Sequence, residues 1–207
     1  MSDFKQAKSP DIEIVQHETA FKGFYRLDKY QLKHRQFAGN MGPVINRELF
    51  VRPDAVCVLP YDPQTDSVVL VEQFRIGALT KSKHPWLLEI VAGIIDTDET
   101  PQQVARREAL EEANLQLQEL WPVTSYYPSP GGSDEYVHLF VGKCSTKDAG
   151  GVFGLAEEGE DIRVHVWSLD AALAAVKDGR IDNAASIITL QWLALNKQEV
   201  VSLWQAK

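Results

Sequence analysis

Cysteine and long apolar runs are scarce in this chain. Cys57 and Cys144 are the only cysteines among its 207 residues. Each lies alone in an apolar segment, so we expect two core positions and neither a disulfide framework nor a cysteine metal site. No apolar run approaches the length of about 18 residues that a membrane-spanning helix needs. The first ten residues also lack the apolar core of a signal peptide, so we expect a cytoplasmic location and no membrane partner.

Basic residues are also fewer than acidic ones. Lys and Arg number 21 against 29 Asp and Glu, which gives a net charge of −8. Nucleic-acid surfaces need clustered Lys and Arg, so this balance argues against a nucleic-acid partner. The five histidines are scattered and form no close ligand pair. An acidic protein that binds an anionic substrate would need metal ions and a few well-placed arginines.

The most informative stretch of the sequence runs from Gly93 to Leu115. Within it, Glu108, Glu111 and Glu112 fall on one face of a helix. Like charges at this spacing repel one another, so the cluster needs either open solvent or a cation as its partner. Oxygen ligands of this kind favour Mg²⁺ or Mn²⁺. A lone acidic face is more often simply solvated, so the metal interpretation depends on the wider pattern.

The ends of this helix can be predicted from residues that cap helices. Thr100, Pro101 and Gln103 have the types and spacing of an N-cap, a first-turn proline and a capping box, which predicts a start near Pro101. Asn114 tolerates the left-handed backbone of a helix C-terminus, which predicts the end. A stripe of small residues suits packing of the helix against a sheet; it comprises Ala105, Ala109 and Ala113.

The full spacing resembles the sequence box of the Nudix hydrolases. The matching positions are Gly93, Glu99, Arg107, Glu108, Glu111, Glu112 and Leu115. One position departs from the pattern, because Asn114 stands where a glycine is usual. Asparagine adopts the same left-handed conformation, so this difference is minor. Arg107 precedes Glu111 by four residues and can therefore orient its carboxylate without binding a metal.

The rest of the chain reads as strands before and after this helix, with two helices at the end. Expected strands are 12–21, 24–34, 47–52, 55–61, 67–75, 86–93, 115–127, 135–144 and 162–169, and the expected C-terminal helices are 169–179 and 182–198, the latter capped by Asp182 or Asn183. This order predicts an α/β fold. The resemblance implies a Nudix-type α/β/α sandwich with a mixed sheet over 51–207. It further implies an N-terminal β extension over 1–50 that mediates a homodimer, with the extension swapped onto the partner.

The resemblance also implies a catalytic site that uses Mg²⁺, with Mn²⁺ as an alternative, and two or three ions. Its metal ligands would be Glu108, Glu111, Glu112, the backbone carbonyl of Ala92, and Glu160. In the branch that cleaves ADP-ribose, the general base comes from an acidic loop after the box. Residues 156–161, AEEGED, fit that loop, and Glu158 is the expected base with Glu160 as the alternative. Loop carboxylates are otherwise most often surface charges.

The expected substrate follows from a second resemblance. Pro130 lies sixteen residues after Asn114, as in Nudix hydrolases specific for ADP-ribose. The reaction implied is hydrolysis of ADP-ribose to AMP and ribose 5-phosphate. The implied substrate contacts are Phe24, Tyr25, Arg47, Glu48, Arg52, Arg75, Ile94, Ser129, Pro130, Gly131 and Glu135. Arginines suit phosphate oxygens and carboxylates suit ribose hydroxyls, although a single arginine can equally be a surface ion pair.

Three alternatives remain open from the sequence. The same chemistry could act on another nucleoside diphosphate sugar, such as GDP-mannose or ADP-glucose, because the box does not distinguish the base or the sugar. A module that binds ADP-ribose without cleaving it would be expected to have lost box carboxylates, yet all are present. Finally, Phe24 and Tyr25 could be half-buried strand residues instead of a stacking platform for adenine.

Overall fold

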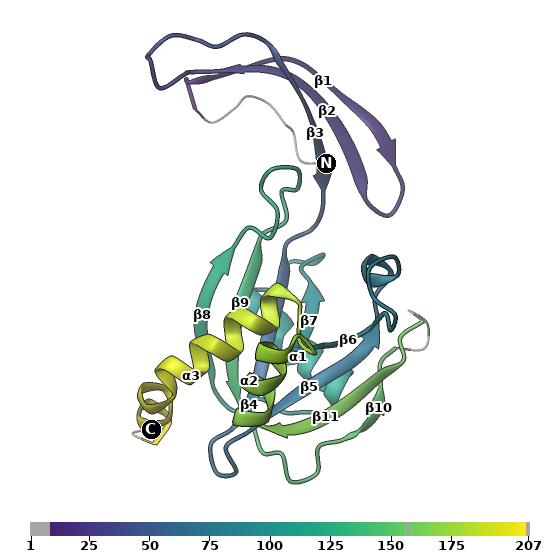
Figure 1. The fold of residues 1–207 in the computed structure, drawn as a ribbon, viewed down its shortest axis with the longest axis vertical. Helices are drawn as coiled ribbons and strands as arrows, with labels where there is room; N and C mark the ends of the chain where they lie inside the picture. The colour runs from purple at the N-terminus through teal and green to yellow at the C-terminus, as the bar shows by residue number, and fades with distance from the viewer. Residues whose placement is uncertain (1–8, 156, 158, 206–207) are drawn as a thin grey trace. The chain divides into compact units, whose positions relative to one another are not determined.

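The computed structural model describes residues 9–155, 157 and 159–205. These residues form two compact units (Figure 1). The smaller unit comprises the chain up to Pro53 together with Tyr127–Glu135. The larger unit comprises Asp54–Tyr126 and the chain from Tyr136 onward.

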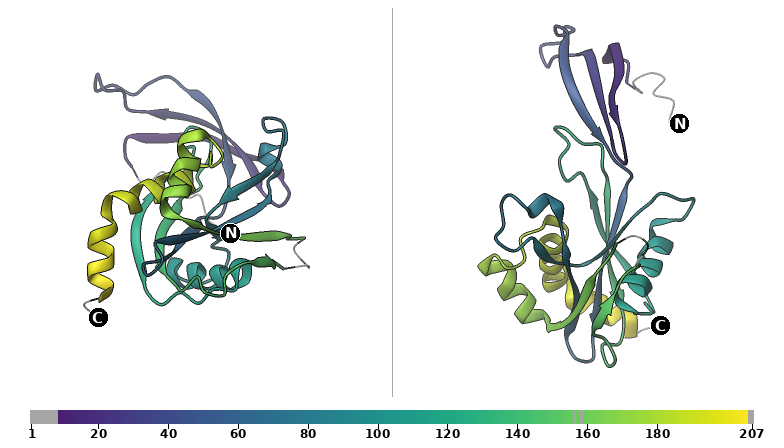
Figure 2. Two further views of the ribbon diagram at one scale, coloured as in Figure 1. Left: turned by 60° about the horizontal axis from the view of Figure 1, so that its bottom comes forward. Right: turned by 90° about the vertical axis from the view of Figure 1, so that its right-hand side faces the viewer.

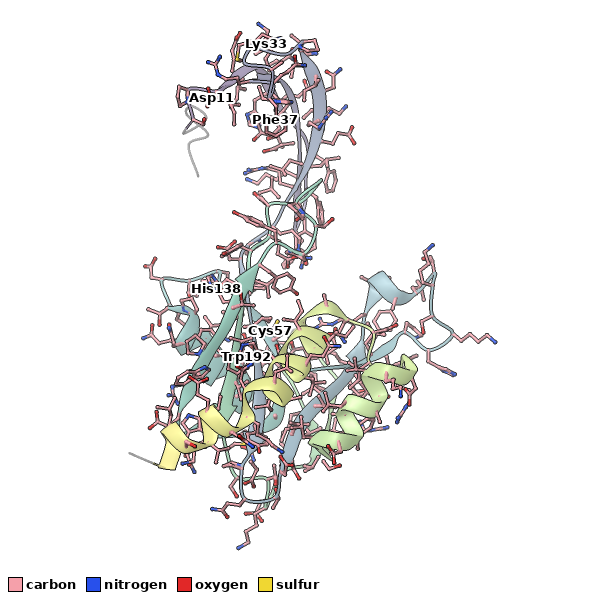
Figure 3. All side chains as sticks on the ribbon, turned by 60° about the vertical axis from the view of Figure 1, so that its left-hand side comes forward. Asp11, Lys33, Phe37, Cys57, His138 and Trp192 are labelled. Atoms are coloured by element: carbon pink, nitrogen blue, oxygen red, sulfur yellow. The ribbon has the colours of Figure 1, made fainter. Side chains whose placement is uncertain are left out.

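The smaller unit is built on a three-stranded antiparallel sheet in the order β1-β2-β3. Its strands are β1 (Ile12–Lys22), β2 (Arg26–His34) and β3 (Ile45–Val51). Strand β2 begins later than expected, because Phe24 and Tyr25 lie in the turn that precedes it. The Phe24 side chain is 83% exposed there, so it does not pack as a strand residue. Phe37, labelled in Figure 3, is a second exposed aromatic residue of this unit.

The larger unit contains an eight-stranded mixed sheet, in which β10-β11-β5-β4-β9-β8 form one path while β6 pairs with β5 and β7 with β4. Only β4 and β9 run parallel, and the other pairs are antiparallel. The strands are β4 (Ala55–Asp62), β5 (Ser67–Phe74), β6 (Trp86–Glu89), β7 (Val91–Ile94), β8 (Leu120–Tyr126), β9 (Val137–Lys143), β10 (Gly151–Phe153) and β11 (Ile162–Ser168). The helices are η1 (Ile76–Ala78), α1 (Pro101–Ala113), α2 (Leu169–Asp178) and α3 (Ala184–Gln205).

Helices cover both faces of this sheet, as Figure 2 shows. Successive residues of a strand point to opposite faces, so one strand serves two cores. On β5, Leu70 packs in the cluster that α2 and α3 cover, whereas Val69 and Val71 pack in the cluster beneath α1. Cys57 lies in the first cluster and Trp192 of α3 packs against it (Figure 3). The expected α/β/α sandwich with a mixed sheet is confirmed.

Helix α1 has the ends that the sequence predicts. Thr100 and Gln103 form the reciprocal capping box, and Asn114 caps the C-terminus with a φ of 52°. The small-residue stripe is buried as expected, since Ala105, Ala109 and Ala113 are at most 1% exposed. Because these residues are small, α1 packs close to the sheet, and this packing sets the distance between its carboxylates and the sheet.

Some elements differ from the sequence expectation. The segment 86–94 forms two short strands instead of one, because the backbone N–H of Ile90 bonds to the Ser186 hydroxyl at 3.0 Å and leaves the sheet ladder. Strand β8 begins at Leu120 instead of residue 115, and the short edge strand β10 was not expected. Cys57 and Cys144 are buried free thiols, as predicted. No helix in the described part of the chain is long and apolar enough to cross a membrane.

Candidate active site

The carboxylates of α1 gather where this helix packs on β7. Glu112 is 2% exposed. Its Oε2 accepts a hydrogen bond from the Ala92 N–H at 3.0 Å, and its Oε1 accepts one from Gln73 Nε2 at 3.4 Å. A side chain from β5 and a backbone group from β7 therefore hold this carboxylate in one orientation.

The backbone of Ala92 presents its polar groups to the same place. Strand β7 pairs with β4 alone, and Ala92 lies opposite Cys57. The N–H of Ala92 points away from β4, because it bonds to Glu112. In a strand the N–H and C=O of one residue point the same way. The carbonyl of Ala92, an expected metal ligand, thus lies on the β7 edge that faces the α1 carboxylates.

Arg107 connects the other acidic residues of the box. Its Nη1 donates to Glu108 Oε1 at 2.8 Å and to Glu111 Oε2 at 2.9 Å. Its Nε donates to Glu99 Oε2 at 3.1 Å. The expected contact between Arg107 and Glu111 is therefore present. One guanidinium partly neutralises three carboxylates that would otherwise repel one another.

Burial makes the ionised form of two of these glutamates costly. It raises the pKa of Glu112 to about 8, and the nearby charges of Glu108 and Glu160 act in the same direction. Burial also raises the pKa of Glu108 to about 7, with Glu111 and Glu160 adding to the effect and Arg107 opposing it. A cluster of this kind favours a bound cation, which would stabilise the ionised carboxylates.

Gly93 allows Glu108 to approach the backbone of β7. A Cβ atom at Gly93 would lie 2.0 Å from Glu108 Oε1 and 2.2 Å from its Cδ. The glycine at the start of the box therefore leaves room for the Glu108 side chain, and its backbone conformation does not call for a glycine. The sequence pattern includes this glycine, and the structure supplies its physical reason.

The described carboxylates do not surround a common metal position. In the described ranges, no three acidic, histidine or cysteine side chains form a group that could hold an ion as they stand. The bonds from Arg107 to Glu108 and Glu111 account for part of this separation.

The acidic loop after β10 approaches the same cluster through Glu160. Its Oε2 accepts the Leu155 N–H at 2.9 Å, and its own N–H donates to the Leu155 carbonyl at 3.2 Å. The Glu160 charge raises the pKa of both Glu108 and Glu112, so it lies near them. Glu158, the expected base, lies outside the described residues.

Arg75 and Glu89 form an ion pair beside this cluster. Arg75 Nε donates to Glu89 Oε2 at 2.7 Å. The Arg75 charge lowers the pKa of Glu112 and therefore acts on the carboxylate group. Ile94, an expected substrate contact, ends β7 opposite Ala55. The larger unit thus contains the described metal candidates together with Arg75 and Ile94.

The smaller unit brings together several of the expected substrate contacts. Arg52 Nη1 donates to Glu135 Oε2 at 3.1 Å, and the Arg52 guanidinium lies 4.9 Å from the centre of the Tyr25 ring. Phe24 and Phe50 flank Tyr25 with ring centroids 4.8 and 5.1 Å away. These side chains form an aromatic and charged surface of the kind that binds a nucleobase.

The Ser129–Gly131 turn belongs to the same unit. The Ser129 carbonyl accepts the N–H groups of Gly132 and Ser133, and the Gly132 carbonyl accepts the N–H of Phe50 at 2.8 Å. The turn is therefore attached to the end of β3, although Phe50 and Gly132 are 82 positions apart in sequence. Pro130 lies within this turn.

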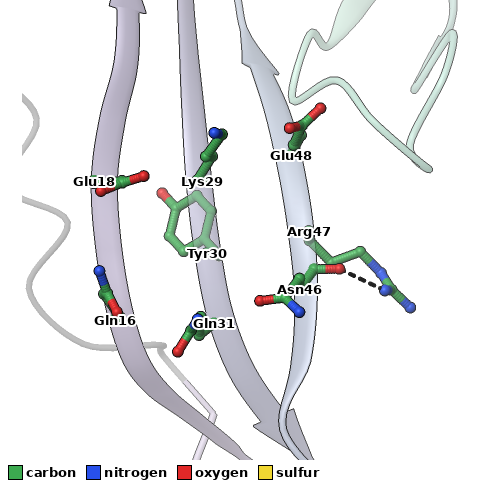
Figure 4. Close-up of a pocket in the computed structure, with 8 residues that line it drawn as sticks. All are labelled: Gln16, Glu18, Lys29, Tyr30, Gln31, Asn46, Arg47 and Glu48. Atoms are coloured by element: carbon green, nitrogen blue, oxygen red, sulfur yellow. Dashed lines mark hydrogen bonds between the residues drawn. The ribbon is translucent and has the colours of Figure 1, made fainter.

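Arg47 and Glu48 are neighbours on β3, so their side chains point to opposite faces of the sheet. Both residues nevertheless line one pocket of about 290 Å³, together with Glu18 and Lys29 (Figure 4). Arg47 Nη1 bonds to the Asn46 carbonyl at 2.8 Å.

Two residues near the site were not identified from the sequence. Gln73 holds Glu112, and Glu89 holds Arg75. Each is a polar residue near the end of a mainly apolar strand, and a polar residue that is largely buried in such a run needs a partner. That signal marks both residues, but the partner depends on how the strands and helices meet in space.

Comparison with known protein families supports the sequence pattern. A family model described as the NUDIX domain matches residues 51–190. The chain is 49% identical to the ADP-ribose pyrophosphatase of Escherichia coli strain K12 over 94% of this chain and 93% of that protein. It is 43% identical to the ADP-ribose pyrophosphatase of Haemophilus influenzae, over 99% of this chain and 96% of that one.

More distant relatives extend the comparison. A GDP-mannose pyrophosphatase of Yersinia pestis is 34% identical over 91% of this chain and 94% of its own length. A crystal structure described as that of an ADP compounds hydrolase matches with a TM-score of 0.67 at 19% identity, covering 94% of this chain and 98% of that one. The structural match supports the fold.

Proposed function

The chain belongs to the Nudix hydrolase family, and from this premise we propose that it hydrolyses the pyrophosphate bond of ADP-ribose. Water adds to one phosphorus, the bridging P–O bond breaks, and AMP and ribose 5-phosphate leave. The observation that carries the proposal is the buried carboxylate group of α1, held by β7 and Gln73, in a chain 49% identical to an ADP-ribose pyrophosphatase.

Nudix hydrolases typically use divalent metals, and the donor set here fits Mg²⁺, with Mn²⁺ as an alternative. Carboxylate and carbonyl oxygens are the ligands these ions prefer. We propose that two or three ions are held by Glu108, Glu111, Glu112, Glu160 and the Ala92 carbonyl. When bound, the ions supply positive charge to the phosphate oxygens and lower the pKa of water. The raised pKa values of Glu108 and Glu112 support this assignment, because they reflect buried charge that lacks sufficient counter-charge.

A methyl group at Gly93 tests the role of Glu108. In Gly93→Ala the new Cβ overlaps the Glu108 side chain from its Cγ outward, so this side chain has to move away from β7. We expect the protein to fold with a lower melting temperature and to bind Mn²⁺ about 10-fold more weakly. Electron paramagnetic resonance titration measures that affinity. Gly77→Ala, where nothing lies within 4 Å of the added atom, is the control. Unchanged Mn²⁺ affinity in Gly93→Ala would argue against Glu108 as a ligand.

The chain's own residues have distinct roles in this proposal. Arg75 and Arg52 neutralise phosphate oxygens, and their forked donors suit that geometry. Phe24 and Tyr25 stack on the adenine, which the exposure of the Phe24 ring supports. Ile94 and the Ser129–Gly131 turn contact the substrate, while the carboxylates of Glu48 and Glu135, together with Arg47, bind its polar groups. Glu158 takes the proton of the attacking water, and Glu160 is the alternative base.

We further propose a homodimer in which residues 1–50 pack on the partner copy. Strand β1 is exposed along nearly its whole length. The smaller unit also exposes large apolar side chains that a second copy could cover; they include Ile12, Val15, Phe21, Met41 and Val44. In such a dimer, Phe24 and Tyr25 complete the partner's site. Sedimentation of the purified protein as a dimer is expected, and a monomer across the assay concentrations would contradict it.

A substrate panel tests the function. The purified protein is assayed with Mg²⁺ on ADP-ribose, ADP-glucose and GDP-mannose, with and without EDTA, and products are separated by chromatography. GDP-mannose is the sharpest competitor, because a GDP-mannose pyrophosphatase is 34% identical to this chain. We expect AMP from ADP-ribose to appear fastest and EDTA to stop the reaction. Faster release of GMP would overturn the substrate assignment, and saturable binding without product would indicate a sensor.

A further inference from the structure

The ion pair between Arg75 and Glu89 has a geometry that orients the arginine. The bond at 2.7 Å uses the arginine Nε and not its terminal nitrogens. In the described chain, those terminal nitrogens have no hydrogen bond. The Arg75 side chain is 41% exposed, whereas that of Glu89 is 14% exposed. A buried carboxylate thus holds the inner part of the guanidinium and leaves its outer donors available to a ligand.

The position of Glu89 is itself held by the start of α3. Asn183 Nδ2 donates to the Leu88 carbonyl at 2.8 Å. The Ile90 N–H donates to Ser186 Oγ at 3.0 Å. These two bonds attach to the backbone on either side of Glu89, so residues more than ninety positions later in sequence hold it in place together with the pairing of β6 and β5.

The Asn183 side chain bonds both to the first turn of α3 and to β6. Its Oδ1 accepts the Ser186 N–H at 3.1 Å and so caps α3, while its amide nitrogen bonds to β6. Ser186 is fully buried at 0% exposure. A helix cap needs only an acceptor. The second bond, and the burial of Ser186, are therefore features beyond the requirements of starting a helix.

We propose that Glu89 is a positioning residue for Arg75, and that Asn183 and Ser186 hold Glu89 so that Arg75 presents its terminal nitrogens to the substrate diphosphate. This inference rests on the proposed function, because it takes Arg75 as a phosphate contact. It adds residues from β6 and α3 that do not themselves touch the substrate. An arginine whose side-chain torsions are already fixed loses less entropy when it binds phosphate. We therefore expect the contacts of Glu89, Asn183 and Ser186 to increase the affinity for substrate.

A double-mutant cycle tests whether Glu89 acts through Arg75. Glu89→Gln, Arg75→Gln and the double variant are compared by KM and kcat for ADP-ribose. We expect Glu89→Gln to raise KM about 10-fold with little change in kcat, since a uniform binding contribution is lost. In the background of Arg75→Gln, the Glu89 change should have almost no further effect, because nothing remains to be positioned. A merely structural role would instead give additive losses.

Two further variants separate positioning from folding. Asn183→Ser keeps a good helix cap and adds no charge, but it cannot reach the Leu88 carbonyl. We expect it to raise KM about 3-fold with a melting curve close to that of the wild type. Asp178→Asn removes the partner of the exposed Arg180 and is the matched control, with unchanged KM.

The outcomes are distinguishable. Wild-type KM in Glu89→Gln, or full additivity in the cycle, overturns the inference while leaving the proposed function intact. If the wild type prefers another nucleoside diphosphate sugar, the substrate assignment fails, and the same cycle on that sugar decides the role of Glu89.

Discussion

Replacing Glu112 with glutamine is expected to lower kcat for ADP-ribose at least ~100-fold while leaving the metal-free protein as stable as the wild type, or more stable. Glutamine keeps an oxygen that can accept the Ala92 N–H, so the local fold should persist. It loses the negative charge, which is the property that a divalent ion requires. Steady-state kinetics with saturating Mg²⁺ measure the first effect, and urea unfolding in EDTA measures the second.

The sign of the stability effect follows from the pKa of this residue. Burial raises the pKa of Glu112 from 4.5 to about 8 in the folded protein. Between pH 4.5 and about pH 8, Glu112 is therefore protonated in the folded protein and ionised in the unfolded protein. In EDTA, wild-type stability should fall as pH rises from about 4.5 to about 8, whereas the variant should lose less over this window.

Glu199→Gln is a suitable control for this experiment, because Glu199 is an exposed residue of α3. It should change neither kcat nor the pH dependence of stability. Near-normal turnover in Glu112→Gln would show that this carboxylate is not a metal ligand, and the assignment of the α1 site would fail with it.

Replacing Glu158 with glutamine is expected to reduce kcat by at least ~100-fold without weakening metal binding. A general base acts on the water proton and need not bind the ion. The described part of the same loop supports a role near the metal candidates, since Glu160 raises the pKa of both Glu108 and Glu112. In the wild type, kcat should rise with pH as the base loses its proton, and this rise should be absent from the pH profile of the variant.

The matched comparison is Glu160→Gln, which should weaken Mn²⁺ affinity about 10-fold if Glu160 is a ligand. Mn²⁺ titration and kinetics on both variants then separate the two roles. Near-normal turnover in Glu158→Gln would move the base elsewhere, and Glu160 would be tested next. Loss of Mn²⁺ affinity in Glu158→Gln would instead identify Glu158 as a ligand.

Local interactions explain why much of α1 could be predicted. The capping box joins residues three apart, and the bond from Arg107 to Glu111 joins residues four apart. These distances are set by helix geometry alone. The strand predictions were less precise at their ends, because hydrogen bonds to distant residues decide where pairing stops. Ile90 illustrates this, since its bond to Ser186 divides one expected strand into two.

The sequence by itself determined the Nudix family, the acidic face of α1 and its ends, because these depend on residue types at fixed short spacings. Only the tertiary structure decided that Gln73 supports Glu112, that Glu89 supports Arg75, and that Asn183, just before α3, holds the backbone next to Glu89. These contacts join residues from 14 to 95 positions apart. Their geometry depends on strand pairing and on helix packing across both faces of the sheet, which no short spacing in the sequence specifies.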